Sequence, residues 1–182
     1  MADLEDVTEE QLEALRNIIS PNGICELPNT ALDVVLDKIL IGEKSAALNK
    51  LSLKRLAVTH VVNCAHGESR YHVTTGPQFY GDEFRYYGIE ATDVPSFDLT
   101  PHFRPAAKFI RDAILGGGAV LVNCVEGVSR SATIVIAYCM LEKRMSLPEA
   151  ITVIRKGRNI CPNDGFLKQL LRFERQLQKS GQ

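Results

Sequence analysis

One stretch constrains this chain more than any other: the apolar run of residues 119–122, which ends at Asn123 and Cys124. The turn residues Gly116–Gly118 precede the run, and a β-branched run bounded in this way predicts a fully buried strand. After Arg130 an apolar stretch continues without Gly or Pro, which predicts a largely buried helix. A strand, a short loop and a helix aim backbone N–H groups and the positive helix end at one point. That point suits a phosphate.

The loop between this strand and this helix carries reactive groups at both ends. Cys124, at a helix N-terminus beside an arginine, is expected to be partly thiolate at neutral pH. Arg130 can reach back and hold two phosphate oxygens with its planar guanidinium, while Gly127 lets the backbone turn its N–H groups inward. Ser131 can donate a hydrogen bond to the sulfur. These residues indicate phosphoryl transfer through a cysteinyl-phosphate.

The spacing from cysteine to arginine is not specific by itself, because the chain contains it twice. The segment Cys64–Arg70 has the same spacing, carries Gly and Ser at the same offsets, and also follows an apolar run. Residues 71–77 after it are polar and broken, so no long helix begins there. We therefore expect Cys64 to be a buried residue at a strand end, with a reactive thiol as the alternative, and Cys124 to be the nucleophile.

Several segments around the loop make the pattern far more specific. They are Thr59–Asn63, Tyr87–Asp93, Cys124–Ser131 (the signature loop) and Pro162–Leu170. Through them the chain, from about residue 32 to residue 178, resembles the small atypical dual-specificity phosphatases of the cysteine-dependent protein tyrosine phosphatase superfamily. One position departs from that family: Asn123 stands where a histidine usually precedes the nucleophile. The departure leaves a second function open, a weakly active or inactive pseudophosphatase that binds phosphoproteins.

The resemblance implies a role for each candidate residue. Asp93 would be the general acid, with Asp98 as its rival, and Ser131 would help the thiolate leave. Arg158 resembles a basic residue that some relatives use for a second phosphate; an ordinary surface arginine is the alternative. The substrate phosphate would be bound by Val125, Glu126, Gly127, Val128, Ser129 and Arg130.

The interior of the loop also bears on the substrate. It holds an acid, Glu126, and no base, whereas phosphoinositide phosphatases of the superfamily tend to place lysines there. We therefore expect a phosphoprotein carrying phosphotyrosine, phosphoserine or phosphothreonine, with a doubly phosphorylated kinase as one candidate. The mechanism requires no cofactor.

Composition excludes other classes of function. The net charge of −1 gives no general attraction to nucleic acid or to an anionic membrane, and no run is apolar enough for a membrane span or a signal peptide. The five cysteines, an odd number without paired spacing, fit a reducing compartment better than a disulfide framework, so we expect cytoplasmic or nuclear residence. The four histidines show no zinc spacing, so no metal site is expected. The oligomeric state stays open.

The order of the predicted elements favours an α/β fold, with a central, mostly parallel sheet flanked by helices as in protein tyrosine phosphatases. We divide the chain into an N-terminal helix and lead-in (residues 1–30) and a catalytic domain (residues 31–179). An edge hairpin is predicted at residues 34–41 and a helix at about residues 43–55. The polar segment His66–Asp82 is either a solvated loop or a wall of the substrate cleft.

Overall fold

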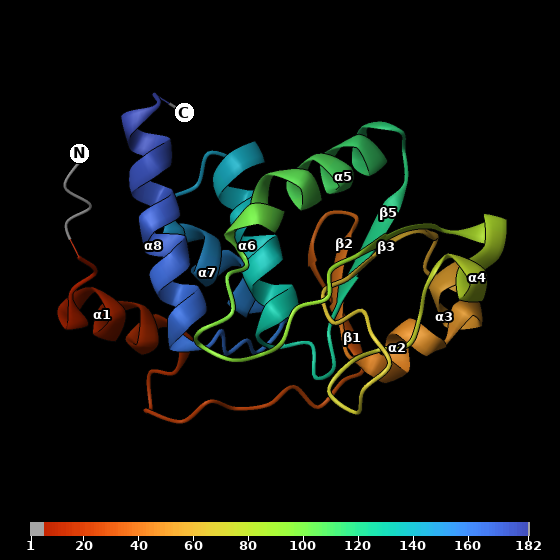
Figure 1. The fold of residues 1–182 in the computed structure, drawn as a ribbon, viewed down its shortest axis with the longest axis horizontal. Coiled ribbons are helices and arrows are strands. Elements are labelled where there is room, and N and C mark those ends of the chain that lie inside the picture. Colours follow the sequence, from red (N-terminus) through yellow and green to blue (C-terminus); the bar gives the residue numbers. More distant parts are fainter. Residues whose placement is uncertain (1–5, 182) are drawn as a thin grey trace.

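The computed structural model describes residues 6–181, and Figure 1 shows them as one sheet covered by helices. The strands are β1 (Leu32–Leu36), β2 (Ile39–Gly42), β3 (Val58–Asn63), β4 (Arg85–Gly88) and β5 (Ala119–Asn123). The α-helices are α1 (Glu9–Ile19), α2 (Lys44–Leu48), α3 (Lys50–Arg55), α4 (Pro77–Tyr80), α5 (Phe103–Leu115), α6 (Arg130–Glu142), α7 (Leu147–Gly157) and α8 (Asp164–Lys179). Two short 3₁₀ helices, η1 (Gly81–Glu83) and η2 (Thr100–His102), complete the order.

The sheet has five strands in the order β1-β2-β5-β3-β4. Strands β1 and β2 form an antiparallel hairpin at one edge, and the other three pairings are parallel. Lys38 in the hairpin turn has a positive φ of 61°, which this tight connection requires. The predictions of an edge hairpin and of a mostly parallel sheet are therefore confirmed.

Helices lie on both sides of the sheet. Figure 1 shows α6, α7 and α8 on one side and α3 and α4 on the other, with α1 beside α8. Capping boxes begin α1 at Thr8 and α7 at Ser146, where the sequence places Gln11 and Glu149 three residues later. The helix predicted over residues 43–55 is instead two helices, because the chain leaves the helical conformation at Asn49, whose side chain caps α3 by accepting from the Ser52 N–H.

Strand β5 and helix α6 form the centre of the molecule. Strand β5 pairs with β2 on one side and β3 on the other, and all of its residues are buried. Residues 130–140 of α6 are buried as well, which explains why this helix is apolar on every face. The carboxyl end of β5 therefore opens between two parallel neighbours, where α/β sheets place their ligand sites.

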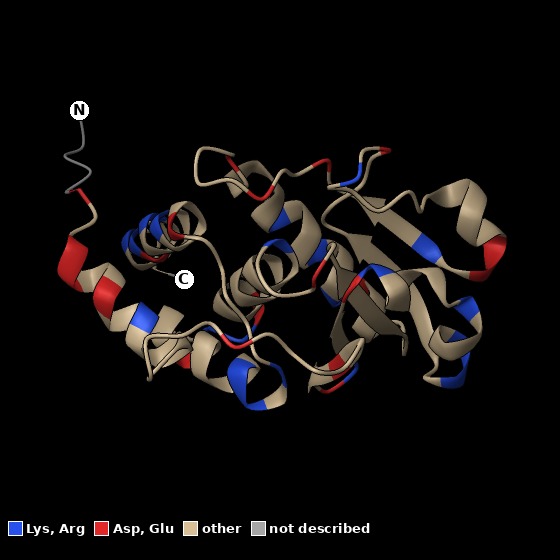
Figure 2. Ribbon diagram, turned by 90° about the horizontal axis from the view of Figure 1, so that it is seen from below, with Lys and Arg blue, Asp and Glu red and all other residues tan. Residues whose placement is uncertain are grey.

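Charged residues of both signs are spread over the surface of the molecule. Figure 2 shows basic and acidic residues interspersed along the ribbon, in keeping with a net charge of −1. Among the helices described, none combines the length and apolar character that crossing a membrane needs.

The expectation of free cysteines needs one correction, because Cys25 and Cys161 form a disulfide across 136 residues of sequence. This disulfide joins the lead-in before β1 to the segment before α8. The spacing of the cysteines in the sequence does not predict it.

Candidate active site

Cys124 lies directly after β5, under a loop that turns back over its sulfur. The Gly127 N–H donates to Cys124 Sγ at 3.2 Å, and Ser131 Oγ lies 3.2 Å from the same sulfur. Gly127 has a φ of 66°, and a Cβ there would stand 2.5 Å from the Gly42 carbonyl oxygen. Only glycine fits this close approach. The predicted neighbours of the sulfur are thus brought together by the end of β5 and the first turn of α6.

Arg130 begins α6, and its guanidinium is buried between the carbonyl oxygens of Ala91 and Tyr71 and the carboxylate of Asp93. Its Nη1 donates to the carbonyl oxygens of Ala91 at 2.8 Å and Tyr71 at 3.1 Å. Its Nε is buried, lies 3.7 Å from Asp93 Oδ2, and has no hydrogen-bond partner within residues 6–181. Buried donors are almost always satisfied, so an unpaired Nε calls for a ligand oxygen. The guanidinium is therefore anchored along one edge and available along another.

The two candidate acids have different surroundings. Asp93 Oδ1 accepts from Ser129 Oγ at 2.8 Å and from Asn163 Nδ2 at 2.8 Å. Asp98 Oδ1 instead accepts from the backbone N–H and the side-chain hydroxyl of Thr100, the first residue of η2. The structure thus joins Asp93 to the signature loop and uses Asp98 at a helix start.

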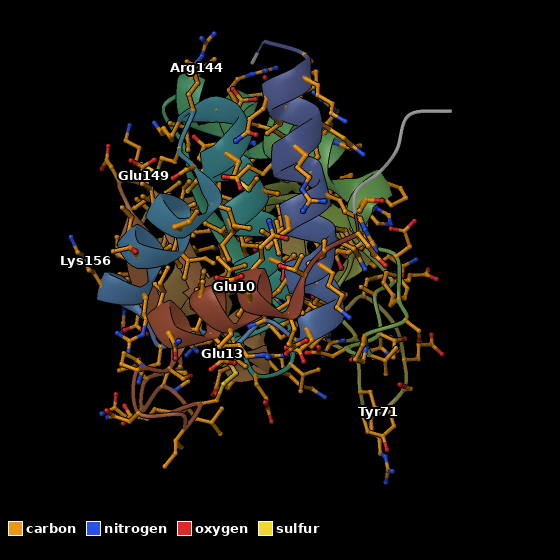
Figure 3. The ribbon with its side chains drawn as sticks, turned by 90° about the vertical axis from the view of Figure 1, so that its left-hand side faces the viewer. Glu10, Glu13, Tyr71, Arg144, Glu149 and Lys156 are labelled. Atoms are coloured by element: carbon orange, nitrogen blue, oxygen red, sulfur yellow. A yellow bond between two sulfur atoms is a disulfide. The ribbon has the colours of Figure 1, made fainter. Side chains whose placement is uncertain are left out.

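The segment of residues 66–82 contributes to the walls of the site. An open cavity of about 430 Å³ is lined by Tyr71, Thr92, Asp93, Val94, Val125, Glu126 and Arg130. Tyr71 stands at the outer end of its segment (Figure 3). Of the two readings of this segment, the structure therefore favours the wall of the cleft at Tyr71.

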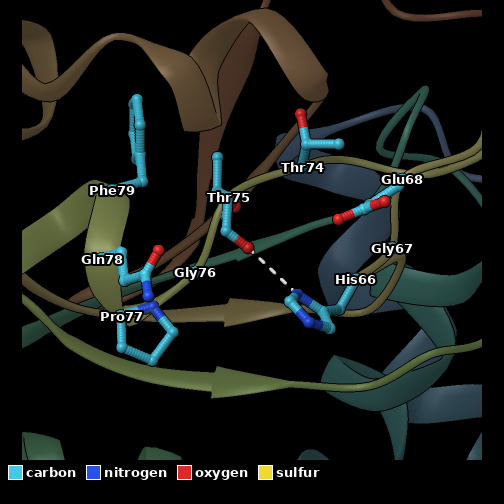
Figure 4. A pocket seen from close by; sticks show the side chains of 9 residues that line it. All are labelled: His66, Gly67, Glu68, Thr74, Thr75, Gly76, Pro77, Gln78 and Phe79. Atoms are coloured by element: carbon cyan, nitrogen blue, oxygen red, sulfur yellow. Dashed lines mark hydrogen bonds between the residues drawn. The ribbon is translucent and has the colours of Figure 1, made fainter.

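A second cavity, of about 500 Å³, lies farther along the same segment and is shown in Figure 4. Its lining runs from His66 to Glu68 and from Thr74 to Phe79, and His66 Nδ1 bonds to the Thr75 carbonyl oxygen at 3.0 Å. It contains neither Cys124 nor Arg130. We therefore place the candidate site at the smaller cavity, on the chemistry of its residues rather than on size.

The predicted phosphate-binding residues do not all face the cavity. Val125 and Glu126 line it, whereas Val128 is buried with its carbonyl oxygen accepting from the Cys161 N–H at 2.7 Å. The Ser129 hydroxyl turns to Asp93. Within residues 6–181, no three His, Cys, Asp or Glu side chains gather closely enough to hold a metal ion.

Arg158 is where the structure differs most from the sequence analysis. Its side chain is completely buried, so it is not the ordinary surface arginine. It forms an ion pair with Asp33 at 2.7 Å and donates to the carbonyl oxygens of Thr30, Glu126 and Gly127. Its guanidinium therefore supports the signature loop through the Glu126 and Gly127 carbonyl oxygens, and contact with a second phosphate stays a prediction.

The loop Cys64–Arg70 (the Cys64 loop) has the spacing of the signature loop but a different environment. Cys64 is completely buried, and burial raises the pKa of its thiol well above its usual value, with the nearby Cys124 acting in the same direction. Arg70 is exposed, with its guanidinium over the ring of Tyr71. No helix follows the loop before α4. The expected burial of Cys64 at a strand end is confirmed.

Asn123, the departure from the family pattern, is completely buried between the strand ends. Its Nδ2 donates to Asn63 Oδ1 at 3.3 Å, and its Oδ1 has no hydrogen-bond partner in the described part of the chain. The amide is therefore directed at β3. No local pattern indicates this pairing, nor the contact of Asn163 with Asp93; an asparagine before a helix, as here before α8, indicates only an N-cap.

Known proteins show the same fold and sequence pattern. A family model described as the dual specificity phosphatase catalytic domain matches residues 39–176. Dual specificity protein phosphatase 13B of Mus musculus is 46% identical over 152 residues, which are 82% of this chain and 76% of that protein. The Homo sapiens protein of the same name is 49% identical over 141 residues, 76% of this chain and 70% of that protein.

Solved structures agree with the sequence relatives. The crystal structure of human DUSP28 matches with a TM-score of 0.72 and 29% identity, covering 84% of this chain and 99% of that chain. A mouse putative dual specificity phosphatase, complexed with zinc tungstate, matches with a TM-score of 0.73 and 30% identity, covering 88% of this chain and 96% of that chain. The chain therefore belongs to the dual specificity phosphatase family and is a protein phosphatase of that class.

Proposed function

We propose that this chain hydrolyses phosphomonoesters on proteins in two steps, with Cys124 as the nucleophile. The observation that carries the proposal is the environment of its sulfur, which receives the Gly127 N–H and lies 3.2 Å from Ser131 Oγ at the start of α6. A thiolate is stabilised by backbone N–H groups and by the positive end of a helix. The buried Nε of Arg130, which has no hydrogen-bond partner among residues 6–181, supports a bound phosphate oxygen.

In the first step, the Cys124 thiolate attacks phosphorus while the P–O bond to the leaving group breaks on the opposite side. Arg130 and the loop amides hold the non-bridging oxygens, whose charge they balance in the transition state. Asp93 gives its proton to the leaving phenol or alkoxide oxygen. The products are the cysteinyl-phosphate, the free hydroxyl group and an ionised Asp93.

In the second step, a water oxygen attacks phosphorus and the S–P bond breaks. Asp93 takes the proton of that water, which restores the acid for the next cycle. Ser131 donates a hydrogen bond to the departing thiolate, and its 3.2 Å distance from the sulfur supports this role. No cofactor takes part in either step.

The walls of the cavity support a phosphoprotein substrate. Tyr71, Val94 and Val125 give it apolar walls that suit an aromatic or aliphatic side chain, and Glu126 repels additional phosphates. The relative of known structure with zinc tungstate holds a tetrahedral oxyanion, which has the shape of phosphate. This likeness supports an oxyanion site in the present chain.

Turnover of para-nitrophenyl phosphate by the purified protein tests the proposal. Wild type should turn over the ester, whereas Cys124→Ser should lose turnover and still bind tungstate in a calorimetric titration, because the rest of the loop is unchanged. Binding of tungstate by wild type without any turnover would instead favour the pseudophosphatase that Asn123 left open. Unchanged turnover in Cys124→Ser would contradict the proposed nucleophile.

A doubly phosphorylated kinase is a more specific proposal for the phosphoprotein substrate. Its support is the family resemblance alone, because the guanidinium of Arg158 bonds to protein atoms. The test compares kcat/KM for one activation-segment peptide carrying one phosphate and the same peptide carrying two. A preference for the doubly phosphorylated peptide supports the proposal, and equal values contradict it.

Residence in the cytoplasm, in the nucleus or in both likewise stays a prediction. It rests on the count and spacing of the five cysteines, two of which, Cys25 and Cys161, are disulfide-bonded in the structure. Imaging of the tagged full chain in cells tests it. Recovery of the chain only from the secretory pathway would contradict it.

A further inference from the structure

Asn163, at the start of α8, connects three parts of the site. Its Oδ1 accepts from the Phe166 N–H at 3.0 Å, which caps the helix. Its own backbone N–H donates to Ser129 Oγ at 3.2 Å, and its Nδ2 donates to Asp93 Oδ1 at 2.8 Å. One residue therefore holds the helix start, the signature loop and the candidate acid together.

The loop that carries Asp93 is docked on the same helix. A Cβ on Gly165 would stand 2.0 Å from the carbonyl oxygen of Pro95, so the loop lies directly on the helix backbone. Farther along, Gln169 Nε2 donates to the Phe97 carbonyl oxygen at 2.7 Å, and its Oε1 accepts from the Leu99 N–H at 2.8 Å. Helix α8 thus fixes the backbone of the loop after Asp93, and the two side-chain donors fix the carboxylate itself.

These contacts distinguish the two oxygens of Asp93. Its Oδ1 accepts from both Asn163 and Ser129, and hydrogen-bond donors at an oxygen disfavour a proton there. Its Oδ2 is the oxygen that lies 3.7 Å from Arg130 Nε, on the side of the phosphate cradle. The proton available to a leaving group is therefore the one on Oδ2.

We propose that Asn163 is a positioning residue for the general acid: its amide, together with the Ser129 hydroxyl, holds Asp93 Oδ1 so that Oδ2 presents the proton to the leaving oxygen. This inference rests on the proposed function, because Asn163 acts only through Asp93. It predicts that loss of the amide affects substrates according to how much protonation their leaving group needs.

The test is Asn163→Ser, assayed on two esters at the same pH and in the same reducing buffer. Serine is also a good N-cap and keeps the backbone N–H, but it lacks the amide donor that reaches Asp93. For phenyl phosphate, a poor leaving group, kcat/KM should fall about tenfold, a part of the roughly 10²–10⁴-fold that general acid catalysis supplies. For para-nitrophenyl phosphate, which needs little protonation, kcat/KM should change by no more than about twofold; kcat/KM is compared because it excludes hydrolysis of the phosphoenzyme, in which Asp93 acts on both esters alike.

Two further variants separate this effect from a general loss of structure. Asn49→Ser makes the same substitution at the cap of α3, whose side chain bonds only to the Ser52 N–H among the contacts described, and it should leave both rates unchanged. Ser129→Ala removes the other donor to Asp93 Oδ1 and should give the same dependence on the leaving group. If Asn163→Ser does not fold, Ser129→Ala provides the test by itself.

A double-mutant cycle with Asp93→Asn decides between the possible failures. If Asp93→Asn slows phenyl phosphate selectively, and Asn163→Ser adds nothing in that background, the two residues act as one unit and the inference is supported. A loss by Asn163→Ser that is equal for both esters, or that persists in the Asp93→Asn background, overturns the positioning role. Absence of any leaving-group effect in Asp93→Asn itself overturns the proposed acid as well.

Discussion

Two loops with the same spacing from cysteine to arginine begin side by side in this molecule. Asn63 and Asn123 are paired in register at the carboxyl ends of the parallel strands β3 and β5, and each is followed by a cysteine. The Cys64 N–H even donates to the Asn123 carbonyl oxygen at 2.7 Å. The two loops therefore share their start, their spacing and the glycine and serine offsets within it.

What differs is the structure that follows each loop. After Cys124 a buried helix begins at Arg130, the Gly127 N–H donates to the sulfur, and the guanidinium of Arg130 is buried against the Ala91 and Tyr71 carbonyl oxygens. After Cys64 the chain enters an irregular segment, and Arg70 points out to the surface. A cysteine and an arginine at this spacing can thus bind and attack a phosphate only where a helix follows them, because the helix fixes the directions of the hydrogen-bond donors.

The largest expected effect separates the two cysteines. Cys124→Ser should lower kcat for para-nitrophenyl phosphate by about 10⁴-fold or more, since removing a nucleophile removes the whole covalent route. Cys64→Ser should keep kcat within about twofold while lowering the unfolding free energy by about 1–3 kcal/mol, because it buries a hydroxyl. The pair of steady-state assays checks this. Loss of turnover in Cys64→Ser at a temperature where it is folded would reverse the assignment.

The next effect separates the two arginines. Arg130→Lys should lower kcat/KM by about 10²–10³-fold, because a point charge cannot hold two oxygens and the anchors on Ala91 and Tyr71 together. Arg70→Lys is the matched control, and its exposed side chain predicts rates like those of wild type. Both variants are compared on para-nitrophenyl phosphate. Near-normal rates in Arg130→Lys would show that the guanidinium is not the clamp.

Alanine substitutions of the paired asparagines, Asn63 and Asn123, should differ in their effect on the free energy of unfolding rather than on the turnover rate. Asn63 accepts from the Ala65 N–H and donates to the Val73 carbonyl oxygen and to Tyr86 Oη, all at about 3 Å, so it organises the Cys64 loop. Asn63→Ala should lower the free energy of unfolding by about 2–3 kcal/mol, because buried partners lose their bonds. Asn123→Ala should cost about 1 kcal/mol or less, because it breaks one bond of 3.3 Å. Urea unfolding of both variants measures the difference, and a larger loss in Asn123→Ala would contradict it.

The smallest effect concerns the reactivity of Cys64. Because burial raises the pKa of its thiol, the thiolate fraction at any given pH is lower than for a free cysteine, and it rises only under alkaline conditions. Iodoacetamide at neutral pH should therefore leave Cys64 untouched until denaturant is added. Cys124 is buried as well, but the Gly127 N–H donates to its sulfur and stabilises a thiolate, so we expect it to be modified in the folded protein. Peptide mapping by mass spectrometry reads out both sites. Equal modification of the two in the folded protein would contradict the protection of Cys64 by burial.

The sequence predicts much of the fold because its signals are local. The β-branched run of β5, the capping boxes at Thr8 and Ser146, and the turn before β2 each depend on neighbouring residues. The difference between the two loops was predictable for the same reason, since residues 71–77 after Arg70 are polar and contain Gly and Pro, which rules out a long helix there.

The parts of the site that the sequence left out depend on long-range contacts. Arg158 meets Asp33 across 125 residues, Asn163 meets Asp93 across 70, and Cys25 meets Cys161 across 136. No periodicity or spacing encodes such partners, because they exist only once the sheet and helices are assembled. The burial of Arg158 was not predictable for this reason: a lone arginine after a helix is typical of a surface, and here its counter-ion comes from β1.

The most direct test of the central claim is to locate the phosphoenzyme. Rapid quenching of wild type with a radiolabelled aryl phosphate, followed by proteolysis and mass spectrometry, identifies the cysteine that carries the phosphoryl group. The account predicts a single labelled peptide, the one containing Cys124, with label absent from the Cys124→Ser variant. Label on the peptide containing Cys64, or turnover without any labelled cysteine, would contradict it.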